Sequence, residues 1–370
     1  MSMKIERIIA YVLRIPLRMP FRISAGEISA KDGVIFACES ADGLVGWGEA
    51  AVDAVPFYAH ETVGSVLDLA KNALAPIMKS RDWANAAELT EAFDHYRGNN
   101  FAKAGLELAF WDLLGKQRGQ SCAAMLGGQR REIETGPSIG IKKTPEETVA
   151  LVGEHLALGR RRIKLKVCPG KDTQYIRAVR EAYPDVTLMV DANNAYSEED
   201  FALIASWDAF NLQMIEQPLH EFDIYFHSLL KQRVKTPICL DESIHSEQDL
   251  RSAIALRAAD IINIKVCRVG GLHKARRLHD ICQEHGLANW IGSRVGMGVA
   301  VASRLAAASL PNCVLPSDAG LCSMYMSDDI VAPLPVLQRG CMVAVPDKPG
   351  LGVDILPDKL AKYTTRKIEL

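Results

Sequence analysis

The segment RIKLKV, residues 162–167, places two lysines one residue apart in a run that is otherwise rich in aliphatic side chains. A basic, glycine-containing turn at 159–161 precedes it, and the segment is predicted to be a β-strand. Residues i and i+2 of a strand point to the same face, so Lys164 and Lys166 should lie side by side. A solvated, basic face on a half-buried strand would explain the pair without any function, and only the rest of the chain can decide against that explanation.

Apolar segments that end in a polar residue recur about every 25 residues from residue 135 onward. The eight predicted strands are 135–141, 162–167, 187–191, 212–216, 238–241, 262–265, 288–292 and 313–318. Five consecutive strands end at Lys166, Asp191, Glu216, Asp241 and Lys265, which are 25, 25, 25 and 24 residues apart. Between the strands lie helix-start signals, a Thr followed by Pro and two acids at 144–147 and a Ser followed by acids at 197–200 and 246–249.

A strand–loop–helix unit repeated eight times at this length is typical of a parallel (β/α) barrel. An open doubly wound sheet is the alternative, but no glycine-rich phosphate loop follows the first strand, and eight units favour closure. The predicted fold class is α/β, a modified (β/α)7β TIM-type barrel with an N-terminal α+β capping domain. The predicted domains are the capping domain at 1–130, the barrel at 131–320, and a C-terminal segment at 321–370 that packs back on the capping domain.

Composition limits the partners and the location of the protein. The 370 residues are 48% hydrophobic and 24% charged with a formal net charge of −2, which argues against a dedicated nucleic-acid or anionic-membrane binder. No apolar run is long enough to span a bilayer, and the N-terminus has no apolar secretory segment. Nine scattered cysteines without a C-x-x-C pair are typical of reduced thiols. We expect a cytoplasmic homo-oligomer that acts on a small molecule, without nucleic-acid or membrane partners.

Three of the strand-ending residues are acidic. Taken singly, each has an ordinary structural explanation: Asp191 begins a turn-like DANN, Glu216 precedes Gln-Pro, and Asp241 is placed to cap a helix. Catalytic groups of a (β/α) barrel lie at the carboxyl ends of the strands, however, so three successive strand ends bring these carboxylates together at the barrel mouth. Three carboxylates in a small volume repel one another and need a cation. An all-oxygen set of ligands selects Mg²⁺ or Mn²⁺ over Zn²⁺.

The lysines flank the carboxylates. Lys164 and Lys166 end the second predicted strand and Lys265 ends the sixth, and these two strands of a barrel lie across the mouth from each other. A ligand on the metal would therefore have an ammonium group on each side. One lysine can take the proton next to a substrate carboxylate while its neighbour holds that carboxylate, and the metal stabilises the resulting enediolate. We therefore interpret the two lysines of RIKLKV as catalytic.

The segments RIKLKV, VDANNAY, IEQPL, CLDES and NIKVCRVGGL resemble, in this order, the signature motifs of the enolase superfamily in its muconate-lactonizing-enzyme branch. The similarity extends to FRISAGE and GWGEA in the predicted capping domain. Within the branch, PSIGI, RIKLKVCPG, TPICLDES and ASLPN are most similar to the o-succinylbenzoate synthase / N-succinylamino acid racemase group. The resemblance implies a Mg²⁺-dependent enzyme that removes a proton α to a carboxylate.

The resemblance also implies roles for individual residues. Lys166 and Lys265 would form the acid/base pair, with Lys164 assisting them. The other implied roles are metal binding by Asp191, Glu216 and Asp241, pocket lining by Ser138 and Asn193, and support of the metal site by Glu242. The substrate would be a small-molecule carboxylate, and we expect its side chain to be recognised by the capping loops around 20–24 and 55–58.

Two departures from the group's pattern concern the substrate. After the seventh strand the group has Met followed closely by Glu-Thr, whereas here Arg294 stands at the Met position and Gly296 at the Glu position. A guanidinium at the pocket wall, near Mg²⁺ and the ammonium groups, is electrostatically unfavourable unless an anion completes the site, which predicts a second or differently placed anionic group on the substrate. The alternative is a surface Arg on a loop. Dipeptide epimerases of the branch carry Asp-x-Asp after the eighth strand. Here Asp318 is kept but Pro316 replaces the first Asp, which weakens that reading.

Several functions remain open from the sequence. The leading hypothesis is racemisation of an N-acylamino acid, dehydration to o-succinylbenzoate, or both. Dipeptide epimerisation and muconate-type cycloisomerisation are the alternatives within the branch. Acid-sugar dehydratase and mandelate-type chemistry are disfavoured, because the resemblance implies that those branches need a catalytic His at the end of the seventh strand and 290–294 contains none. Outside the branch, the alternatives are a Schiff-base lysine aldolase on the same barrel and a catalytically inactive scaffold.

Overall fold

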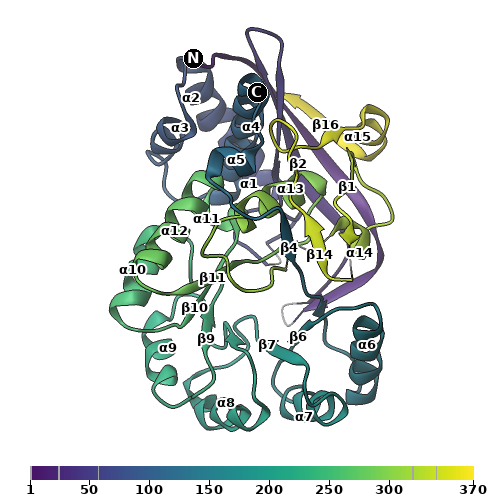
Figure 1. The fold of residues 1–370 in the computed structure, drawn as a ribbon. Helices are drawn as coiled ribbons and strands as arrows, with labels where there is room; N and C mark the ends of the chain where they lie inside the picture. The colour runs from purple at the N-terminus through teal and green to yellow at the C-terminus, as the bar shows by residue number, and fades with distance from the viewer. Residues whose placement is uncertain (1, 24–25, 57, 319–320, 339) are drawn as a thin grey trace.

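The computed structural model describes residues 2–23, 26–56, 58–318, 321–338 and 340–370. Figure 1 shows an N-terminal antiparallel sheet with helices, above a curled parallel sheet whose outer side is covered by helices. The predicted fold class is therefore confirmed. Within the described part of the chain, none of the helices has the length and apolar composition needed to cross a membrane. The nine cysteines are all free thiols, and eight of them are buried.

The N-terminal sheet has the order β16-β1-β2-β3 and is antiparallel throughout. Its strands are β1 (Ile5–Ile23), β2 (Gly26–Ser40), β3 (Val45–Ala50) and β16 (Thr364–Glu369). The last strand of the chain thus pairs with the first, with Val12 opposite Arg366. The helices of this part are α1 (Val63–Leu69), the π-helical turn η1 (Ala70–Leu74), α2 (Ala75–Ser80), α3 (Ala86–Phe93), α4 (Asn100–Arg118) and α5 (Cys122–Leu126).

The segment between the barrel and β16 returns along the outside of the barrel. A small antiparallel sheet of order β13-β14-β4 joins β13 (Leu337–Gln338) and β14 (Met342–Ala344) to β4 (Glu132–Glu134). The remaining elements are α14 (Cys322–Tyr325), β12 (Val331–Ala332), which pairs with β15 (Asp354–Ile355), and α15 (Pro357–Tyr363). The chain after the barrel therefore contacts both parts of the molecule, and the residue boundaries of the three predicted domains stay predictions.

The glycines of GWGEA allow β3 to lie directly against α4. A Cβ atom at Gly48 would stand 2.0 Å from the carbonyl oxygen of Gly105, and one at Gly46 would stand 2.1 Å from that of Ala109. Both neighbouring atoms are backbone, so they cannot move aside as a flexible side chain would. This close packing holds the N-terminal sheet against α4.

We expect Gly48→Ala to destabilise the protein by about 1–3 kcal/mol or more, because the added methyl group overpacks the joint between β3 and α4. Urea unfolding followed by circular dichroism measures the change. Gly64→Ala is the matched control, since a Cβ atom there would have only one neighbour, Thr62 Oγ1 at 3.7 Å. Equal stability of the two variants would contradict the proposed close contact.

The second sheet has seven parallel strands in the order β11-β10-β9-β8-β7-β6-β5. The strands are β5 (Ser138–Ile139), β6 (Arg162–Lys166), β7 (Thr187–Asp191), β8 (Ile215–Glu216), β9 (Ile238–Leu240), β10 (Ile261–Ile264) and β11 (Ala288–Ile291). The intervening and following helices are α6 (Pro145–Ala157), α7 (Thr173–Ala182), the 3₁₀ helix η2 (Glu198–Asp200), α8 (Phe201–Ser206), the 3₁₀ helix η3 (Trp207–Phe210), α9 (Ile224–Lys231), α10 (Glu247–Ala255), α11 (Val266–Val269), α12 (Leu272–Glu284) and α13 (Gly298–Ala308). Seven of the eight predicted strands are thus confirmed.

The eighth predicted strand, 313–318, is wrong as a regular strand. The segment makes only two isolated parallel bridges, Asn289 with Cys313 and Thr135 with Ser317. Pro316 interrupts it and has no N–H group to donate to a neighbouring strand. The two bridges nevertheless place the segment between the two edges of the seven-stranded sheet, where it completes the barrel.

The predicted helix starts at 144–147 and 246–249 are confirmed. The Thr144 hydroxyl accepts a hydrogen bond from the N–H of Glu147, and Pro145 occupies the first turn of α6. The Ser246 hydroxyl caps α10 in the same way. At 197–200 the cap is also present, but the first turn is the 3₁₀ helix η2, which leads into α8.

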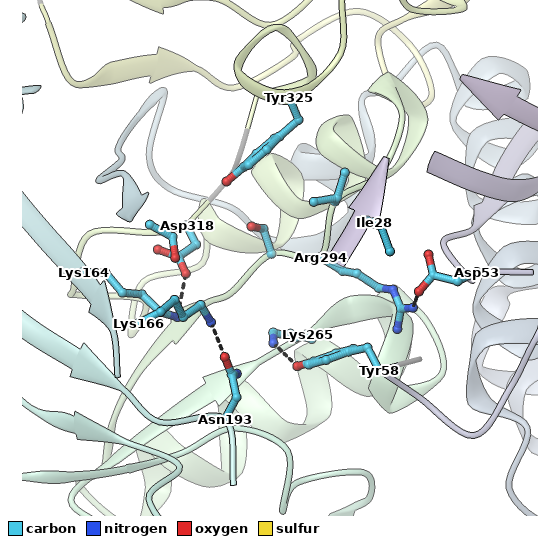
Figure 2. Close-up of a pocket in the computed structure, with 13 residues that line it drawn as sticks. Ile28, Asp53, Tyr58, Lys164, Lys166, Asn193, Lys265, Arg294, Asp318 and Tyr325 are labelled. Carbon is cyan, nitrogen blue, oxygen red and sulfur yellow. Dashed lines mark hydrogen bonds and ion pairs between the residues drawn. The ribbon is translucent and has the colours of Figure 1, made fainter. Parts of the chain in front are cut away.

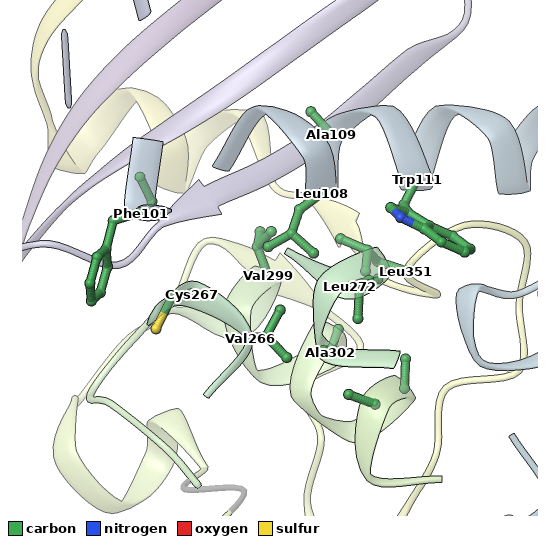
Figure 3. Packing of buried hydrophobic residues seen from close by; sticks show 14 of the residues in the cluster. Phe101, Leu108, Ala109, Trp111, Val266, Cys267, Leu272, Val299, Ala302 and Leu351 are labelled. Atoms are coloured by element: carbon green, nitrogen blue, oxygen red, sulfur yellow. The ribbon is translucent and has the colours of Figure 1, made fainter. Parts of the chain in front are cut away.

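A continuous hydrophobic core joins the two parts of the molecule through α4. Figure 3 shows Leu108 of α4 facing Val266, Leu272 and Val299 of the barrel helices α11, α12 and α13. The buried Glu107 of α4 adds a polar contact, since its carboxylate accepts hydrogen bonds at 2.9 and 2.8 Å from the first two N–H groups of α12. The N-terminal part is thereby held firmly against the barrel.

Candidate active site

The three predicted metal ligands lie at neighbouring strand ends. Asp191 and Glu216 are opposite each other in the ladder between β7 and β8, and Asp241 directly follows β9. All three side chains are buried, with at most 1% of each residue exposed. The period of 25 residues therefore does bring the carboxylates to one edge of the sheet, as expected of a parallel barrel.

Lys164 lies among these carboxylates and is not exposed to solvent. Its Nζ is 2.8 Å from Asp191 Oδ2 and 2.8 Å from Glu216 Oε2, donates to Asp318 Oδ2 at 2.9 Å, and lies 5.1 Å from the centre of the Trp290 ring. Burial lowers the pKa of Lys164, but the carboxylates, Asp191 foremost, outweigh burial and raise this pKa well above its ordinary value. The group stays charged, and the solvated strand face considered from the sequence is excluded.

Lys166 reaches the same carboxylate from the end of β6. Its Nζ donates to Asp191 Oδ2 at 2.5 Å and to Asn193 Oδ1 at 2.7 Å. Asn193 has a left-handed backbone, with φ of 43°, and its own N–H donates to Asp191 Oδ1 at 3.0 Å. The turn after β7 thus holds the amide oxygen towards Lys166.

Lys265 reaches the site from the end of β10. Its Nζ donates to Asp241 Oδ2 at 2.6 Å and to the hydroxyl oxygen of Tyr58 at 2.6 Å. Arg268, one turn further on in α11, places Nη1 2.6 Å from Asp241 Oδ1. Behind them, Glu242 Oε1 accepts a hydrogen bond from the Tyr58 hydroxyl at 2.8 Å. Figure 2 shows Lys265 and Lys166 directed into one cavity from different strands.

The three carboxylates are not equally balanced by these cations. Burial raises the pKa of Asp191, but nearby cations, Lys164 foremost, outweigh burial and lower this pKa below its ordinary value. Burial also raises the pKa of Asp241, and there Arg268 is the foremost of the cations that outweigh it and lower the pKa. Burial and repulsion from Asp191 instead raise the pKa of Glu216 well above its ordinary value, although Lys164 opposes them. The charged form of Glu216 is therefore the least stabilised of the three.

The donor chemistry of this group fits a hard divalent cation. All the candidate ligand atoms are carboxylate oxygens. Two of them, Glu216 Oε2 and Asp241 Oδ1, are held by ion pairs with Lys164 and Arg268 and not by geometrically formed hydrogen bonds from the described residues. In the described part of the chain, no three acidic, His or Cys side chains already surround a single point as metal ligands would. Lys164 Nζ stands between Asp191 and Glu216. A cation bound here would replace the ammonium groups as the partner of these carboxylate oxygens. The assignment of the three metal ligands remains a prediction.

The cavity at the barrel mouth brings together most of the predicted site residues. Its lining includes seven of them: Ser138, Lys164, Lys166, Asn193, Lys265, Arg294 and Asp318. The Ser138 hydroxyl is buried and has no hydrogen-bond partner among the described residues, so it is available to a ligand. Of the two expected capping loops, 55–58 supplies Tyr58 to the lining, while Phe57 and the Ser24 end of 20–24 lie outside the described residues.

Asp318 is in the cavity wall, but its carboxylate is already engaged. Oδ1 accepts from Arg162 Nη2 at 2.7 Å and Oδ2 accepts from Lys164 Nζ at 2.9 Å. Burial raises the pKa of Asp318, but Lys164 and Arg162 outweigh it and hold this pKa below its ordinary range. The carboxylate thus orients Lys164, and its predicted contact with substrate remains a prediction.

Arg294 has an anionic partner that the sequence did not suggest. Its Nη2 donates to Asp53 Oδ2, and Asp53 Oδ1 accepts from the buried Lys31 at 3.1 Å. The guanidinium also stacks against the Tyr58 ring, 4.9 Å from its centre. The expectation that only a substrate anion could balance Arg294 is therefore wrong, because Asp53 of the N-terminal part balances it.

Sequence reasoning missed several residues of the site. Asp53, Tyr325 and Ile28 line the cavity, and Arg268 pairs with a predicted metal ligand. Arg268 lies within the quoted motif NIKVCRVGGL, three residues after Lys265, and this helical spacing was a usable signal. For the other three the sequence offers no local signal, because Ile28 and Asp53 are distant in the chain from the barrel strand ends and Tyr325 lies beyond the repeating strand–helix units.

Two family models match the chain. The N-terminal domain of mandelate racemase / muconate lactonizing enzyme matches residues 5–127, and the enolase C-terminal domain-like model matches residues 147–359. The chain belongs to the mandelate racemase / muconate lactonizing enzyme family. It is an enolase-superfamily member, as the sequence motifs indicated, and members of this family use a divalent metal, typically Mg²⁺.

Similar members of this family carry two activities in their names. An o-succinylbenzoate synthase from Geobacillus kaustophilus is 42% identical over 364 residues, 98% of this chain and 97% of the relative. An N-succinylamino acid racemase from Amycolatopsis sp is 39% identical and covers 99% of each chain. Among solved structures, an enolase-superfamily member from Listeria innocua matches with a TM-score of 0.96 at 35% identity, covering 100% of this chain and 99% of that chain.

Proposed function

We propose that this family member removes the proton α to the carboxylate of an N-acylamino acid and returns a proton on either face, so that the amino acid is racemised. The observation that carries the proposal is the placement of Lys166 and Lys265. They enter one cavity from the second and sixth strands, with the carboxylates of the three intervening strands between them. Racemisation requires an acid and a base on opposite faces of the α-carbon, and this arrangement supplies both.

The surrounding residues have separate roles in the proposal. Lys164, whose ammonium group also donates to Asp318 Oδ2, holds the substrate carboxylate and does not act as a base. A Mg²⁺ ion, or Mn²⁺ in its place, held by Asp191, Glu216 and Asp241 would supply the positive charge that stabilises the enediolate. Ser138 and Asn193 line the cavity around the reacting carbon. A cytoplasmic location and a homo-oligomer stay predictions from the sequence.

Dehydration to o-succinylbenzoate is the second candidate. The 42% identity to a protein named for that activity favours it. A syn elimination begins with the same removal of an α-proton, but only Lys166 would move the proton. Lys265 would then stabilise the enediolate by its charge. The same cavity can therefore serve both reactions.

The other functions fit the site less well. Dipeptide epimerisation needs a free carboxylate for the substrate ammonium group, and both oxygens of Asp318 already accept from Arg162 and Lys164. A Schiff-base lysine must be neutral to attack a carbonyl, whereas the raised pKa of Lys164 keeps that group charged. An inactive scaffold would not need a buried set of lysines and carboxylates.

Proton exchange in D₂O tests the proposal. With Mg²⁺ present, N-succinyl-L-amino acids should lose their α-¹H signal in NMR spectra and become racemic by chiral chromatography, and EDTA should stop both changes. In a parallel assay, formation of the aromatic product from the hydroxycyclohexadiene carboxylate precursor of o-succinylbenzoate measures dehydration. Absence of exchange with every N-acylamino acid would overturn racemisation, and absence of both reactions would overturn α-proton removal altogether.

Arg294 should recognise an acceptor at the end of the substrate away from the metal. The residue is 8% exposed, lines the cavity, and has an Nη1 without a hydrogen-bond partner among the described residues. A charge-assisted hydrogen bond to that nitrogen is worth about 1.5–3 kcal/mol. We expect Arg294→Met to lower kcat/KM about 10- to 150-fold for an N-succinyl substrate.

The matched comparison uses an N-acetyl amino acid, which lacks the second carboxylate. The same substitution should change kcat/KM for that compound little. Equal losses on the two compounds would show that Arg294 only maintains the wall together with Asp53. Unchanged kcat/KM on both would place Arg294 outside the binding region.

A further inference from the structure

The two proposed acid/base lysines are joined by a continuous set of hydrogen bonds. On one side, Lys166 Nζ donates to Asn193 Oδ1 at 2.7 Å, and Asn193 Nδ2 donates to Glu242 Oε1 at 2.9 Å. On the other side, Lys265 Nζ donates to the Tyr58 hydroxyl at 2.6 Å, and that hydroxyl donates to Glu242 Oε1 at 2.8 Å. Both paths end on one carboxylate oxygen, and Figure 2 shows the contacts of each lysine with its neutral partner.

Among the described residues, Lys166 and Lys265 each donate to one carboxylate and to one neutral partner. The carboxylates are Asp191 for Lys166 and Asp241 for Lys265, and both are proposed metal ligands. A divalent cation competes with an ammonium group for such oxygens. The hydrogen bonds that can hold the two amines when the carboxylates are engaged are therefore those to Asn193 and Tyr58.

The neutral partners are themselves firmly held. Asn193 is 9% exposed and Glu242 is 3% exposed. Lys265 Nζ lies 5.0 Å and Arg294 Cζ 4.9 Å from the centre of the Tyr58 ring. Tyr58 comes from the segment between β3 and α1, whereas the other members lie at barrel strand ends. The N-terminal part thus contributes one of the two contacts that direct the lysines.

Resting on the proposed function, we propose that Tyr58 is the positioning residue for Lys265 and Asn193 the positioning residue for Lys166, with Glu242 as their common anchor. A lysine side chain has several rotatable bonds, so its amine must be held near the line of attack on the α-carbon to act efficiently. Tyr58 fixes the amine on one face of the substrate and Asn193 fixes it on the other. Neither residue transfers the proton itself.

The proposal predicts a face-selective loss of activity. Tyr58→Phe removes only the hydroxyl group and keeps the ring. Asn193→Gly removes the amide contacts to Lys166 and Glu242, and glycine tolerates the left-handed backbone at this position. We expect Tyr58→Phe to lower the α-proton exchange rate of the enantiomer served by Lys265 about tenfold or more, the effect of losing one hydrogen bond to a charged group. Exchange of the other enantiomer and KM should change much less, and Asn193→Gly should show the reverse selectivity.

Equal slowing of both enantiomers in each variant would overturn the proposal, because a general disturbance of the cavity has no face preference. Exchange of both enantiomers at the wild-type rate would overturn it as well. The faces are assigned with Lys166→Ala and Lys265→Ala, and circular dichroism verifies folding of each variant.

A second readout does not depend on turnover. In Mg²⁺-loaded protein without substrate, where the cation engages Asp191 and Asp241, a limiting amount of an amine-acetylating reagent is added, and peptide mass spectrometry gives the ratio of labelling at Lys265 to labelling at Lys166. Tyr58→Phe should raise this ratio and Asn193→Gly should lower it, since each variant frees one amine. An unchanged ratio in both variants would overturn the proposal even if the wild-type protein racemises its substrate. A shifted ratio in a protein that exchanges no α-proton would refute the proposed function and leave the positioning contacts standing.

Discussion

Glu216→Gln should lower kcat by about a thousandfold or more while the protein stays folded, because the positive charge of a bound cation is worth several kcal/mol to an enediolate. The substitution removes the carboxylate whose pKa is already raised by burial and by Asp191. Loss of its charge therefore costs little folding stability. Asp241→Asn should reduce activity similarly but also destabilise the fold, because it leaves the buried Arg268 without its anion.

Thermal unfolding with and without Mg²⁺ gives the control for this prediction. A ligand that binds only the folded state raises Tm, so Mg²⁺ should raise Tm of the wild-type protein and have a much smaller effect on Glu216→Gln. In the absence of Mg²⁺, the two proteins should differ little in Tm. Near-full turnover of Glu216→Gln with the same Mg²⁺ dependence would refute the assignment of the metal site.

Lys166→Ala and Lys265→Ala should each stop α-proton exchange of one enantiomer and together define the two faces of the site. Removal of a positioned general base typically costs about 10²- to 10⁴-fold in rate, and racemisation should fall by this factor in both variants. The enantiomer whose α-proton faces the remaining lysine should still exchange with D₂O. Measuring the loss of the α-¹H signal for each pure enantiomer separates the two effects.

Lys171→Ala is a suitable control for these variants. Lys171 lies shortly after β6, and its Nζ donates to the Lys142 carbonyl oxygen and does not line the cavity. Its removal should leave both exchange rates near the wild-type values. Loss of both exchanges in Lys166→Ala and also in Lys265→Ala would mean that the lysines act jointly, and the assignment of one base to each face would be wrong.

The parts of the site that follow a strand end were predictable. A parallel strand delivers its terminal side chain to a fixed edge of the sheet, so the positions of Asp191, Glu216 and Asp241 follow from local sequence and from the repeat length alone. The same reasoning holds for Lys166 and Lys265. This reasoning failed for the segment 313–318, because its apolar pattern resembles that of a strand but Pro316 prevents regular pairing.

What the sequence by itself determined is the barrel and the polar residues at its strand ends that are the candidate site residues, because these depend on periodicities within a few residues and on a repeat of 25. Only the tertiary structure decided which partner each charged group has. Asp53 meets Arg294 across 241 positions, Tyr58 meets Lys265 across 207, and Arg162 meets Asp318 across 156. Contacts over such separations depend on how the N-terminal part docks on the barrel and how the barrel closes. These are outcomes of packing the whole chain, and no local pattern encodes them.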